Sequence, residues 1–442
     1  MNAYPEDITK YFPVQQVTWS SNHKNSVRGI HISPYAKLLT CVRGSVYDVV
    51  VDMRPDSPSY LQWAAVHLTS TNGLQILIPS DCGHGYLALE EDAAVIYCQG
   101  GFFDKSIPQH SASVFDPILS IAWPIKNPEE NVLISSKDKM VEYLNLPDKR
   151  IIPHRKRILI IGSTGQVGST FFHTIKKNYP EFIVIGTTHN LKKPQRLSFD
   201  LESDAMDPLK MKLLLDACSP HVIIIAAAFT NVNLCESQTE KTNKINCEAV
   251  VQIAKLGKER NIKIIVFSTD LVFNSPNPEN FPNCINTIEK DIGLREDSPT
   301  NPPNYYGLSK LKSEKALLCE VPTSLIIRTS RIFGPEEVKK NFANQVVQNL
   351  LTGKEMTLLS DELSCPTYNK DLCEAVMLLI KKDCSGIYHI VGPEVMSKYQ
   401  WGLKIAEYFK LDSKWLISKS SDELKLLALR GKFTALSTHK FR

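Results

Sequence analysis

The first third of the chain alternates short apolar runs with polar turns. SVYDVVVD (residues 45–52), LQILIP (74–79) and AAVIYCQ (93–99) are rich in β-branched and aromatic residues, and Gly, Pro, Asn or Asp separate such runs. No long helical period appears before about residue 135. Short runs bounded by turn residues predict an all-β sandwich or barrel.

From residue 157 the pattern changes to apolar strands that alternate with helical stretches. RILIIG (157–162), FIVIGTT (182–188), HVIIIAAA (221–228) and IKIIVFSTD (262–270) have the composition of buried strands. This alternation predicts βαβ units on a doubly wound parallel sheet, an α/β Rossmann fold. The stretch between the two patterns has Pro and basic residues without periodicity. We therefore expect an all-β domain over 1–145, a linker over 146–156 and an α/β domain over 157–442.

Composition narrows the class of protein without identifying its chemistry. The chain has 442 residues, a net charge of +4 and no concentrated basic patch, which argues against a nucleic-acid partner. Its 11 cysteines are scattered without zinc-type spacing, which fits a reducing compartment and no metal site. The N-terminus lacks a signal-peptide core, and the longest apolar run (222–229) is too short for a membrane span. These features predict a soluble cytoplasmic protein.

A glycine-rich turn follows the first strand of the second half. In GSTGQVG, Gly162, Gly165 and Gly168 are spaced G-x-x-G-x-x-G between a strand and the start of a helix. Glycines in this context let the backbone approach a pyrophosphate, which then lies at the helix N-terminus. The turn therefore predicts a dinucleotide cofactor.

The end of the next strand bears on the choice between NAD and NADP. IGTTHNLKK has no Asp or Glu to bind the ribose hydroxyls, whereas Thr187, His189, Lys192 and Lys193 could face a 2′-phosphate. This favours NADPH over NADH. Asp200, in LSFDLES, is a candidate to hydrogen-bond the adenine.

A tyrosine and a lysine four residues apart form the candidate catalytic pair. In NYYGLSKLKSE, Tyr306 and Lys310 share one face of a predicted helix. A neighbouring ammonium lowers the pKa of a tyrosine and lets it deliver a proton to a carbonyl as hydride arrives. Thr269, at the end of the strand FSTD, could hold the same oxygen.

Together these motifs resemble the extended short-chain dehydrogenase/reductases, and within them the dTDP-4-dehydrorhamnose reductase family. The matching strings include GSTGQVG, AAAFTNV, FSTDLVF, YYGLSK, RTSRIFG and GIYHIVG. The resemblance implies reduction of a nucleotide-linked 4-keto-6-deoxy sugar at C4, with substrate bound by the C-terminal part of the domain. It assigns Val232 and Arg331 to the substrate, and Thr269, Tyr306 and Lys310 to catalysis. The residues assigned to the cofactor are Gly162, Thr164, Gly165, Gln166, Val167, Gly168, Asp200, Leu201, Ala227, Ala228, Thr230, Tyr306 and Lys310.

This chain departs from the reductase pattern at three positions. Leu271 replaces the Tyr that usually follows STD, Arg331 replaces the Trp of TSW, and Asn233 replaces the Asp of VD. In the family the first two positions lie on the sugar side, so these departures concern the identity of the substrate rather than the chemistry.

The first half carries its own set of ionisable residues. The stretch VRGIHISPYAKLL contains an arginine, a histidine and a lysine within a few positions of one another. The stretches HGY, VYDVVVDMR and VIYCQ add further polar groups. The residues concerned are Arg28, His31, Lys37, Asp48, His84 and Tyr97. Strand alternation places residues i and i+2 on one face, so spacing alone leaves open whether Arg28 or Lys37 shares a face with His31. Solvated surface and a second active site both remain open from the residues alone.

The order of these pieces resembles the dTDP-4-dehydrorhamnose 3,5-epimerase family, whose fold is a cupin jelly roll. The matching strings are VRGIH, AKLLTCVRGSVYDVVVDMRPDSPSY, LIPSDCGHGYLAL, VFDPILSIAWP and LISSKDK. The resemblance implies that His31 is a general base paired with Asp138 and that Tyr97 is the general acid. It places Gln16, Arg28, Lys37, Asp48 and His84 at the substrate.

Such residues suit an epimerisation without a redox cofactor. A C4 ketone acidifies the hydrogens at C3 and C5, so that a His–Asp pair can remove one while Lys37 stabilises the enolate oxygen. Tyr97 then returns a proton from the opposite face. Cupin histidines often bind metal, but His31 and His84 lack a full ligand set.

Two departures concern the epimerase half. The segment before residue 16 is shorter than in the family, so the exchanged N-terminal strand of its usual homodimer is expected to be missing. Phe102 and Phe103 stand where tyrosine is common, which could weaken stacking on the nucleotide base or restrict epimerisation to one carbon.

The leading hypothesis is therefore a bifunctional enzyme that epimerises and then reduces one dTDP- or UDP-linked 4-keto-6-deoxy sugar, giving an L-rhamnose-type product. The alternatives are a reductase whose cupin domain epimerises only C3 or is an inactive binding or dimerisation module. A cofactor-binding regulatory subunit is a further alternative, against which Thr269, Tyr306 and Lys310 argue.

Overall fold

The structure is a computed structural model that describes residues 13–55, 57, 59–102, 110–125, 127–144, 156–189, 197–276, 285–286, 293–335, 341–424 and 427–442. Contacts divide the chain into two compact units. The N-terminal unit comprises 1–156 and 212–219, and the C-terminal unit comprises 157–211 and 220–442. Nearly all of the predicted linker, 146–156, lies outside the described residues.

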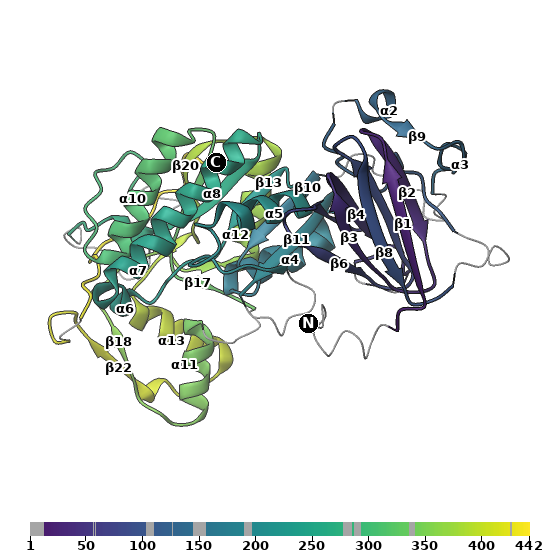
Figure 1. Cartoon of the computed structure of the whole chain (residues 1–442). Helices are drawn as coiled ribbons and strands as arrows, with labels where there is room; N and C mark the ends of the chain where they lie inside the picture. Colours follow the sequence, from purple (N-terminus) through teal and green to yellow (C-terminus); the bar gives the residue numbers. More distant parts are fainter. Residues whose placement is uncertain are drawn as a thin grey trace. The chain divides into compact units, whose positions relative to one another are not determined.

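The N-terminal unit contains two β-sheets, whose strands are purple and blue in Figure 1. The four-stranded sheet consists, in spatial order, of β1 (Gln16–Asn22), β8 (Ala93–Gln99), β3 (Lys37–Arg43) and β6 (Gln75–Ile78). The five-stranded sheet consists of β5 (Trp63–Thr69), β4 (Ser45–Asp52), β7 (Cys82–Ala88), β2 (Ser26–Ile32) and β9 (Leu133–Ile134). All recorded pairings are antiparallel except that of β2 with β9. Two short helices, α2 (Pro128–Asn131) and α3 (Ser136–Lys139), flank β9.

Apolar side chains from both sheets form one core between them. Leu39 of β3 and Val95 of β8 pack with Val46 of β4 and Ala88 of β7. Residues 110–125 cover the other face of the five-stranded sheet through a second core. Strand β4 is therefore buried on both faces, which explains why its sequence is apolar almost throughout. The predicted sandwich is confirmed.

The C-terminal unit is built on a seven-stranded sheet. Its strands, in spatial order, are β12 (Leu197–Ser198), β11 (Phe182–Thr188), β10 (Lys156–Ile161), β13 (Val222–Ile225), β14 (Lys263–Thr269), β16 (Leu325–Thr329) and β20 (Gly386–His389). Neighbouring strands run parallel from β10 to β20 and between β12 and β11. The order reverses direction between β10 and β13, and such switch points are where doubly wound sheets bind ligands. The predicted α/β fold is confirmed.

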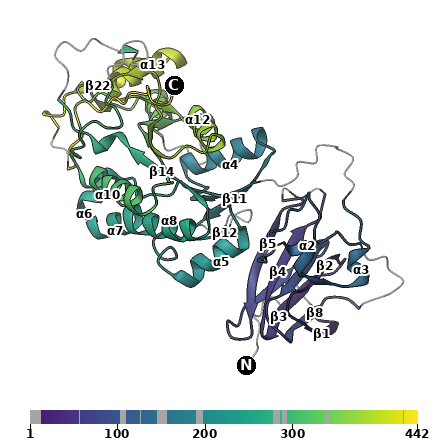
Figure 2. The ribbon, with the colours of Figure 1, turned by 90° about the horizontal axis from the view of Figure 1, so that it is seen from above.

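Helices cover both faces of this sheet, as Figure 2 shows. On one face α4 (Gln166–Asn178) and α12 (Asn369–Lys381) pack against the strands. On the other face lie α8 (Ala249–Glu259) and α10 (Tyr305–Glu320). The remaining helices of the unit's Rossmann part are α6 (Val232–Ser237), α7 (Thr239–Asn243), the π-helix η1 (Lys244–Glu248) and the 3₁₀ helix η2 (Asp270–Val272). Helix α5 (Pro208–Cys218) begins in this unit, but its residues from 212 onward belong by their contacts to the N-terminal unit.

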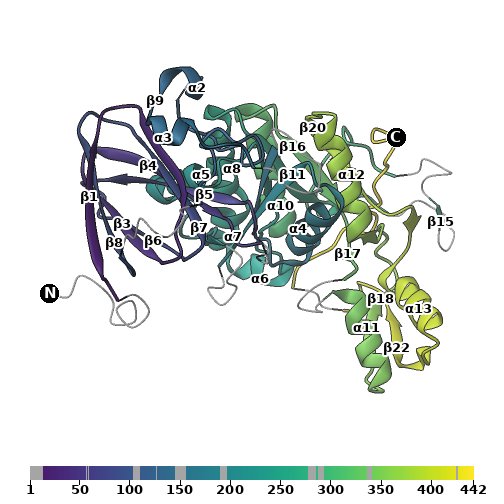
Figure 3. The same cartoon turned by 90° about the vertical axis from the view of Figure 1, so that its right-hand side faces the viewer.

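A small group of helices and strands outside the Rossmann sheet completes the C-terminal unit, and Figure 3 shows it as a separate group of elements. It contains α11 (Phe342–Leu351), α13 (Lys398–Phe409), η3 (Ser413–Trp415) and the parallel pair β18 (Met356–Leu359) and β22 (Leu416–Lys419), packed around their own apolar core. Two further pairs are β17 (Ile332–Phe333) with β19 (Thr367–Tyr368) and β15 (Ile285–Asn286) with β21 (Glu394–Val395). None of the described helices is both long and apolar enough to cross a membrane.

Candidate active sites

A cavity of about 330 Å³ opens between the two sheets of the N-terminal unit. Six of the eight residues predicted there contribute to its wall: Gln16, Arg28, His31, Lys37, His84 and Tyr97. Asp48 and Asp138 stand behind two of these residues. We call this space the epimerase-type cavity.

An irregularity in β2 places Arg28 and His31 on the same wall. Arg28 pairs with Tyr86 and His31 pairs with His84, so two residues of β2 oppose one residue of β7 between these pairs. The extra residue makes this a β-bulge, which reverses the alternation of side chains. Gly29 lies in the bulge with a φ of 111°, and a Cβ there would come within 2.5 Å of the carbonyl oxygen of His84. Glycine is therefore required for this wall.

His31 is held by a buried carboxylate. Its Nε2 lies 2.8 Å from Oδ1 of Asp138, on α3, next to the strand β9 that pairs with β2. The Oγ of Ser135 caps α3 by accepting from the backbone N–H of Asp138 (3.1 Å). Burial raises the pKa of Asp138, but the hydrogen bond to His31, the charge of His31 and the hydrogen bonds from Ser135 and Gly29 together outweigh it and leave the pKa below its ordinary value. The carboxylate is therefore ionised at neutral pH, so it accepts the hydrogen on Nε2 of His31 and fixes the orientation of the ring.

The sequence-based placement of Asp48 on the substrate needs a correction. Asp48 is fully buried, and its Oδ2 lies 2.8 Å from Nε2 of His84. Burial raises the pKa of Asp48, and the charge of His84 opposes this rise. The carboxylate thus orients His84 from behind the wall. The error arose because β4 is buried on both faces, so its alternation did not show which side chains reach solvent.

The four-stranded sheet supplies the opposite wall. Gln99 pairs with Gln16 on one side and with Lys37 on the other, which places all three side chains on one face. Tyr97 lies two residues before Gln99 and shares that face. Burial lowers the pKa of Lys37 and raises the pKa of Tyr97, so the phenol of Tyr97 keeps its proton at neutral pH.

Sequence reasoning missed a second tyrosine of the cavity, on β7 of the five-stranded sheet. Tyr86 lines the cavity, and its hydroxyl donates to Oγ of Ser20 (3.2 Å) and to Oδ1 of Asn22 (3.3 Å). The same Asn22 oxygen accepts from Nε of Arg28 (3.2 Å). The i, i+2 relation between His84 and Tyr86 could have identified it. Of the predicted aromatic pair, Phe102 is 67% exposed and does not line the cavity, whereas Phe103 lies outside the described residues.

A cavity of about 620 Å³ lies over the switch point of the C-terminal unit. We call it the reductase-type cavity. Most residues predicted for cofactor and substrate line it: Gly162, Thr164, Gly165, Gln166, Val167, Ala227, Ala228, Thr230, Val232, Thr269, Tyr306 and Arg331. Leu271 and His189 also contribute.

The glycine turn leaves the start of α4 open to this cavity. Gly162 has a φ of 83°, and a Cβ there would come within 2.6 Å of the side chain of Ala227. Gly165 is the N-cap of α4 and offers no capping side chain, so first-turn N–H groups remain available to an anion. These features fit a pyrophosphate at this point.

Two other parts of the cofactor prediction are corrected. Thr187 is fully buried, and its hydroxyl accepts from the N–H of Gly162 (3.3 Å), so it supports the turn and cannot face a 2′-phosphate. The carboxylate of Asp200 accepts from the N–H groups of Glu202 (2.8 Å) and Ser203 (3.3 Å). Gly168, Asp200 and Leu201 do not line the cavity, and Lys192 and Lys193 lie outside the described residues.

Tyr306 and Thr269 line the reductase-type cavity, and Lys310 lies behind its wall beside β14. Asn304 caps α10, and its side chain accepts from the N–H of Gly307 (2.8 Å). Lys310 donates from Nζ to the carbonyl oxygen of Phe267 (3.0 Å) and lies behind the cavity wall. Burial lowers the pKa of Lys310 to about 8.

The expected lowering of the pKa of Tyr306 is a further correction. Burial, with the nearby Asp270, raises the pKa of Tyr306 above its ordinary value, because the loss of solvation disfavours the phenolate. The phenol therefore carries its proton at neutral pH. Thr269 donates to Oδ1 of Asp270 (3.1 Å) and accepts from the N–H of Leu271 (3.2 Å).

Three ionic residues of this cavity had not been predicted. Glu362, Lys398 and Arg430 line it together with Arg331. They come from segments far apart in the sequence, which no motif connects.

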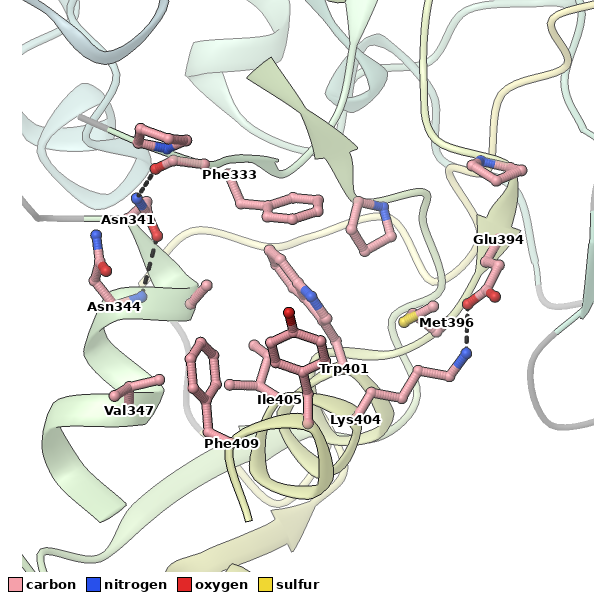
Figure 4. Close-up of a pocket in the computed structure, with 16 residues that line it drawn as sticks. Phe333, Asn341, Asn344, Val347, Glu394, Met396, Trp401, Lys404, Ile405 and Phe409 are labelled. Atoms are coloured by element: carbon pink, nitrogen blue, oxygen red, sulfur yellow. Dashed lines mark hydrogen bonds and ion pairs between the residues drawn. The ribbon is translucent and has the colours of Figure 1, made fainter. Parts of the chain in front are cut away.

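A second cavity of the C-terminal unit, about 820 Å³, has a largely apolar lining and is shown in Figure 4. Phe333, Trp401 and Ile405 contribute to it, and an ion pair joins Glu394 and Lys404 at its edge. Phe333 points into it while its neighbour Ile332 lines the reductase-type cavity, so β17 separates the two. It contains none of the predicted site residues.

Comparison with known proteins identifies a family for each half of the chain. Residues 156–442 match the protein family described as RmlD substrate binding domain, and residues 3–145 match the family described as dTDP-4-dehydrorhamnose 3,5-epimerase. The sequence-based resemblance of each half is thereby confirmed.

Individual relatives cover one half or the other. The dTDP-4-dehydrorhamnose 3,5-epimerase of Shigella flexneri is 34% identical over 140 residues, 31% of this chain and 75% of the relative. The methionine adenosyltransferase 2 subunit beta of Danio rerio is 28% identical over 277 residues, 61% of this chain and 79% of the relative. A solved dTDP-4-dehydrorhamnose reductase from Clostridium acetobutylicum is 25% identical with a TM-score of 0.55, covering 64% of this chain and 90% of that one.

Proposed function

Because the chain belongs to the RmlD substrate binding domain family over residues 156–442 and matches the 3,5-epimerase family over residues 3–145, we propose that it is a bifunctional nucleotide-sugar enzyme. The N-terminal unit epimerises C3 and C5 of a dTDP- or UDP-4-keto-6-deoxyglucose. The C-terminal unit then reduces the C4 ketone with NADPH. The enzyme acts as a cytoplasmic homodimer, and the product is a 6-deoxy-L-hexose of the L-rhamnose type.

One observation carries the epimerase half of this proposal. His31, with Asp138 behind it, and Tyr97 come from the two different sheets that enclose one cavity. A base and an acid on opposite walls are what inversion of a carbon between them requires.

The epimerisation follows from the protonation states. Because Asp138 accepts the Nε2 proton, the free Nδ1 lone pair of His31 takes the proton from C3 or C5, and Asp138 stabilises the resulting imidazolium. The electron pair moves to the C4 oxygen, where Lys37 donates to the enolate. Tyr97 gives its proton to the opposite face of the carbon. His31 then loses its extra proton to solvent, and Tyr97 takes up a proton from solvent.

The reduction uses a separate set of residues. When bound at the glycine turn, NADPH supplies the hydride. Tyr306 donates its phenolic proton to the C4 oxygen as that oxygen becomes negative. Thr269 also holds this oxygen once its hydroxyl turns away from Oδ1 of Asp270. Lys310, anchored on Phe267, places positive charge behind the tyrosine and favours its transient ionisation.

Two observations favour alternative functions. The exposed Phe102, where the epimerase family commonly has tyrosine, favours epimerisation at C3 alone or a cupin that only binds or dimerises. The relative named as a subunit of methionine adenosyltransferase favours a regulatory role for the C-terminal unit. The hydrogen bond of His31 to Asp138, and the presence of Tyr306 on the cavity wall with Lys310 one turn further along α10, support the bifunctional enzyme over both.

Deuterium exchange tests the proposal directly. The full chain is incubated with dTDP- and UDP-4-keto-6-deoxyglucose in deuterated water, first without and then with NADPH. We expect deuterium at C3 and C5 without NADPH, followed by NADPH oxidation and a C4 alcohol. Deuterium at C3 alone indicates the mono-epimerase, and NADPH oxidation without any exchange contradicts the bifunctional enzyme.

The cofactor preference gives a second expected result. The end of β11 has no carboxylate among its described residues, and the exposed His189 lines the cavity. A carboxylate there would repel the 2′-phosphate of NADPH. A hydrogen bond from His189 to that phosphate would instead raise the affinity roughly tenfold or more. We therefore expect a KM for NADPH about tenfold below that for NADH in steady-state kinetics. Equal KM values would contradict the preference.

A further inference from the structure

Asn22, the last residue of β1, links the two sheets that enclose the epimerase-type cavity. Its Oδ1 accepts from Nε of Arg28 (3.2 Å) and from the hydroxyl of Tyr86 (3.3 Å), on β2 and β7 of the five-stranded sheet. Its Nδ2 donates to the carbonyl oxygen of Ala93 (3.4 Å), on β8 of the four-stranded sheet. Because a guanidinium can only donate, the amide oxygen must face Arg28 and the amide nitrogen must face β8. One buried side chain thus holds the two sheets together beside the cavity.

Arg28 depends on Asn22 for its position. Arg28 is exposed and lines the cavity, and its guanidinium makes one hydrogen bond with the described part of the chain, the one to Asn22. A long exposed side chain samples many rotamers unless a contact fixes it. Tyr86, which pairs with Arg28 across β2 and β7, donates to the same amide oxygen and so orients it. Asn22 and Tyr86 together therefore decide where the guanidinium lies.

Tyr97 is the group on which this guanidinium acts. It lies on β8 of the opposite sheet and lines the same cavity as Arg28 and Tyr86. Its hydroxyl makes no hydrogen bond with any residue that the structure describes. Burial and the neighbouring Tyr86 raise the pKa of Tyr97, whereas the charge of Arg28 opposes this rise. Arg28 therefore favours the ionised form of Tyr97.

The step in which Tyr97 acts leaves a negative charge on its oxygen. As the O–H bond of Tyr97 breaks, its proton forms the new C–H bond with the electron pair of the enolate. A phenolate remains until solvent returns a proton. At that moment Lys37 is engaged by the C4 oxygen, and His31 carries the first proton beside Asp138. Arg28 is the cation of the cavity wall that is left to offset the phenolate.

We propose that Asn22 and Tyr86 are positioning residues for the proton transfer from Tyr97. They hold the guanidinium of Arg28 where it stabilises the phenolate that this transfer leaves. Both roles rest on the proposed epimerase function, and both concern only one of its two proton transfers. The removal of the first proton by His31 does not use them, because Asp138 supports that step.

Two products of the reaction in deuterated water separate the two transfers. A substrate carbon that gives its proton to His31 and regains a deuteron from His31 is exchanged without inversion. A carbon that receives its deuteron from Tyr97 is both exchanged and inverted. The ratio of inversion to total exchange therefore reports the transfer from Tyr97. Because both products come from the same complex, weaker substrate binding does not change this ratio.

The ratio is measured by mass spectrometry and NMR for the full chain with dTDP-4-keto-6-deoxyglucose, without NADPH. We expect Asn22→Leu to lower the ratio roughly 10-fold, as the loss of a hydrogen bond to a charged group does, while most of the exchange persists. Persisting exchange also shows that the variant is folded. Tyr86→Phe, which keeps the buried ring, should lower the ratio by a smaller factor. Ser21→Ala is the matched control, because Ser21 is the neighbour of Asn22 on β1, is exposed and lies outside the cavity.

A double substitution tests whether Asn22 acts through Arg28. Arg28→Met should lower the ratio at least as much as Asn22→Leu, and the two substitutions together should lower it no further than Arg28→Met alone. A ratio that stays at the wild-type value in Asn22→Leu and Tyr86→Phe, because inversion and exchange fall equally or not at all, overturns the proposal. An additive loss in the double variant overturns it as well. A wild-type protein that shows no exchange contradicts the proposed epimerase function instead.

Discussion

Replacing His31 by alanine should abolish deuterium exchange at C3 and C5 while leaving the reduction of a pre-epimerised ketone intact. His31 and His84 both line the cavity with a buried carboxylate behind the ring, and His31 faces Tyr97 from the opposite sheet in the position that the epimerase resemblance gives to the base. Removing a general base costs about 10²- to 10⁴-fold in rate. The measurement is the initial rate of deuterium incorporation by mass spectrometry without NADPH, followed by NADPH oxidation with the epimerised ketone.

Two further variants sharpen this expectation. Asp138→Asn should lower exchange by a smaller factor, because the amide no longer stabilises the imidazolium but still fills the space. His23→Ala is the matched control, since His23 is exposed, pairs with Glu91 and lies outside the cavity. Exchange that persists in His31→Ala at the wild-type rate would show that another base acts. A folded His31→Ala protein that also fails to reduce the epimerised ketone would show that the two sites are not independent.

The fold of each half could be predicted from the sequence because burial dictates the spacing of apolar residues. The strand over 45–52 and the strand over 93–99 have the predicted bounds, since each is apolar between turn residues. The predicted strand HVIIIAAA is longer than β13, which ends at Ile225. Its last residues instead form the cavity wall at Ala227 and Ala228, where the backbone must approach a ligand.

The site could be predicted only where residues lie in one motif. Arg28 and His31 share a wall through the bulge at Gly29, and no simple alternation predicts that arrangement. The buried positions of Asp48 and Thr187 depend on packing against strands that are distant in sequence. Arg331, Glu362, Lys398 and Arg430 share one cavity only because four separate segments of the chain meet there. Long-range packing, which no local pattern encodes, decides all these positions.

Replacing Tyr306 by phenylalanine should stop the reduction while exchange at C3 and C5 continues. The substitution removes one hydroxyl and keeps the ring, so the packing of α10 is retained. Because burial raises the pKa of Tyr306, the wild-type phenol is protonated at neutral pH and can act as the acid. Loss of a general acid again lowers the rate by about 10²- to 10⁴-fold. The measurement is single-turnover oxidation of NADPH in the presence of the epimerised ketone.

The neighbouring tyrosine provides the control for this variant. Tyr305 lies on the same helix, one residue away, but does not line the cavity, so Tyr305→Phe should reduce the ketone at the wild-type rate. Tyr306→Phe should still bind NADPH, because the glycine turn is untouched. If Tyr306→Phe reduces the ketone as fast as the wild type, the proton comes from another group. The residues proposed for exchange lie in the N-terminal unit, which this substitution leaves unchanged. If Tyr306→Phe binds NADPH but loses exchange as well, the two active sites are not separable.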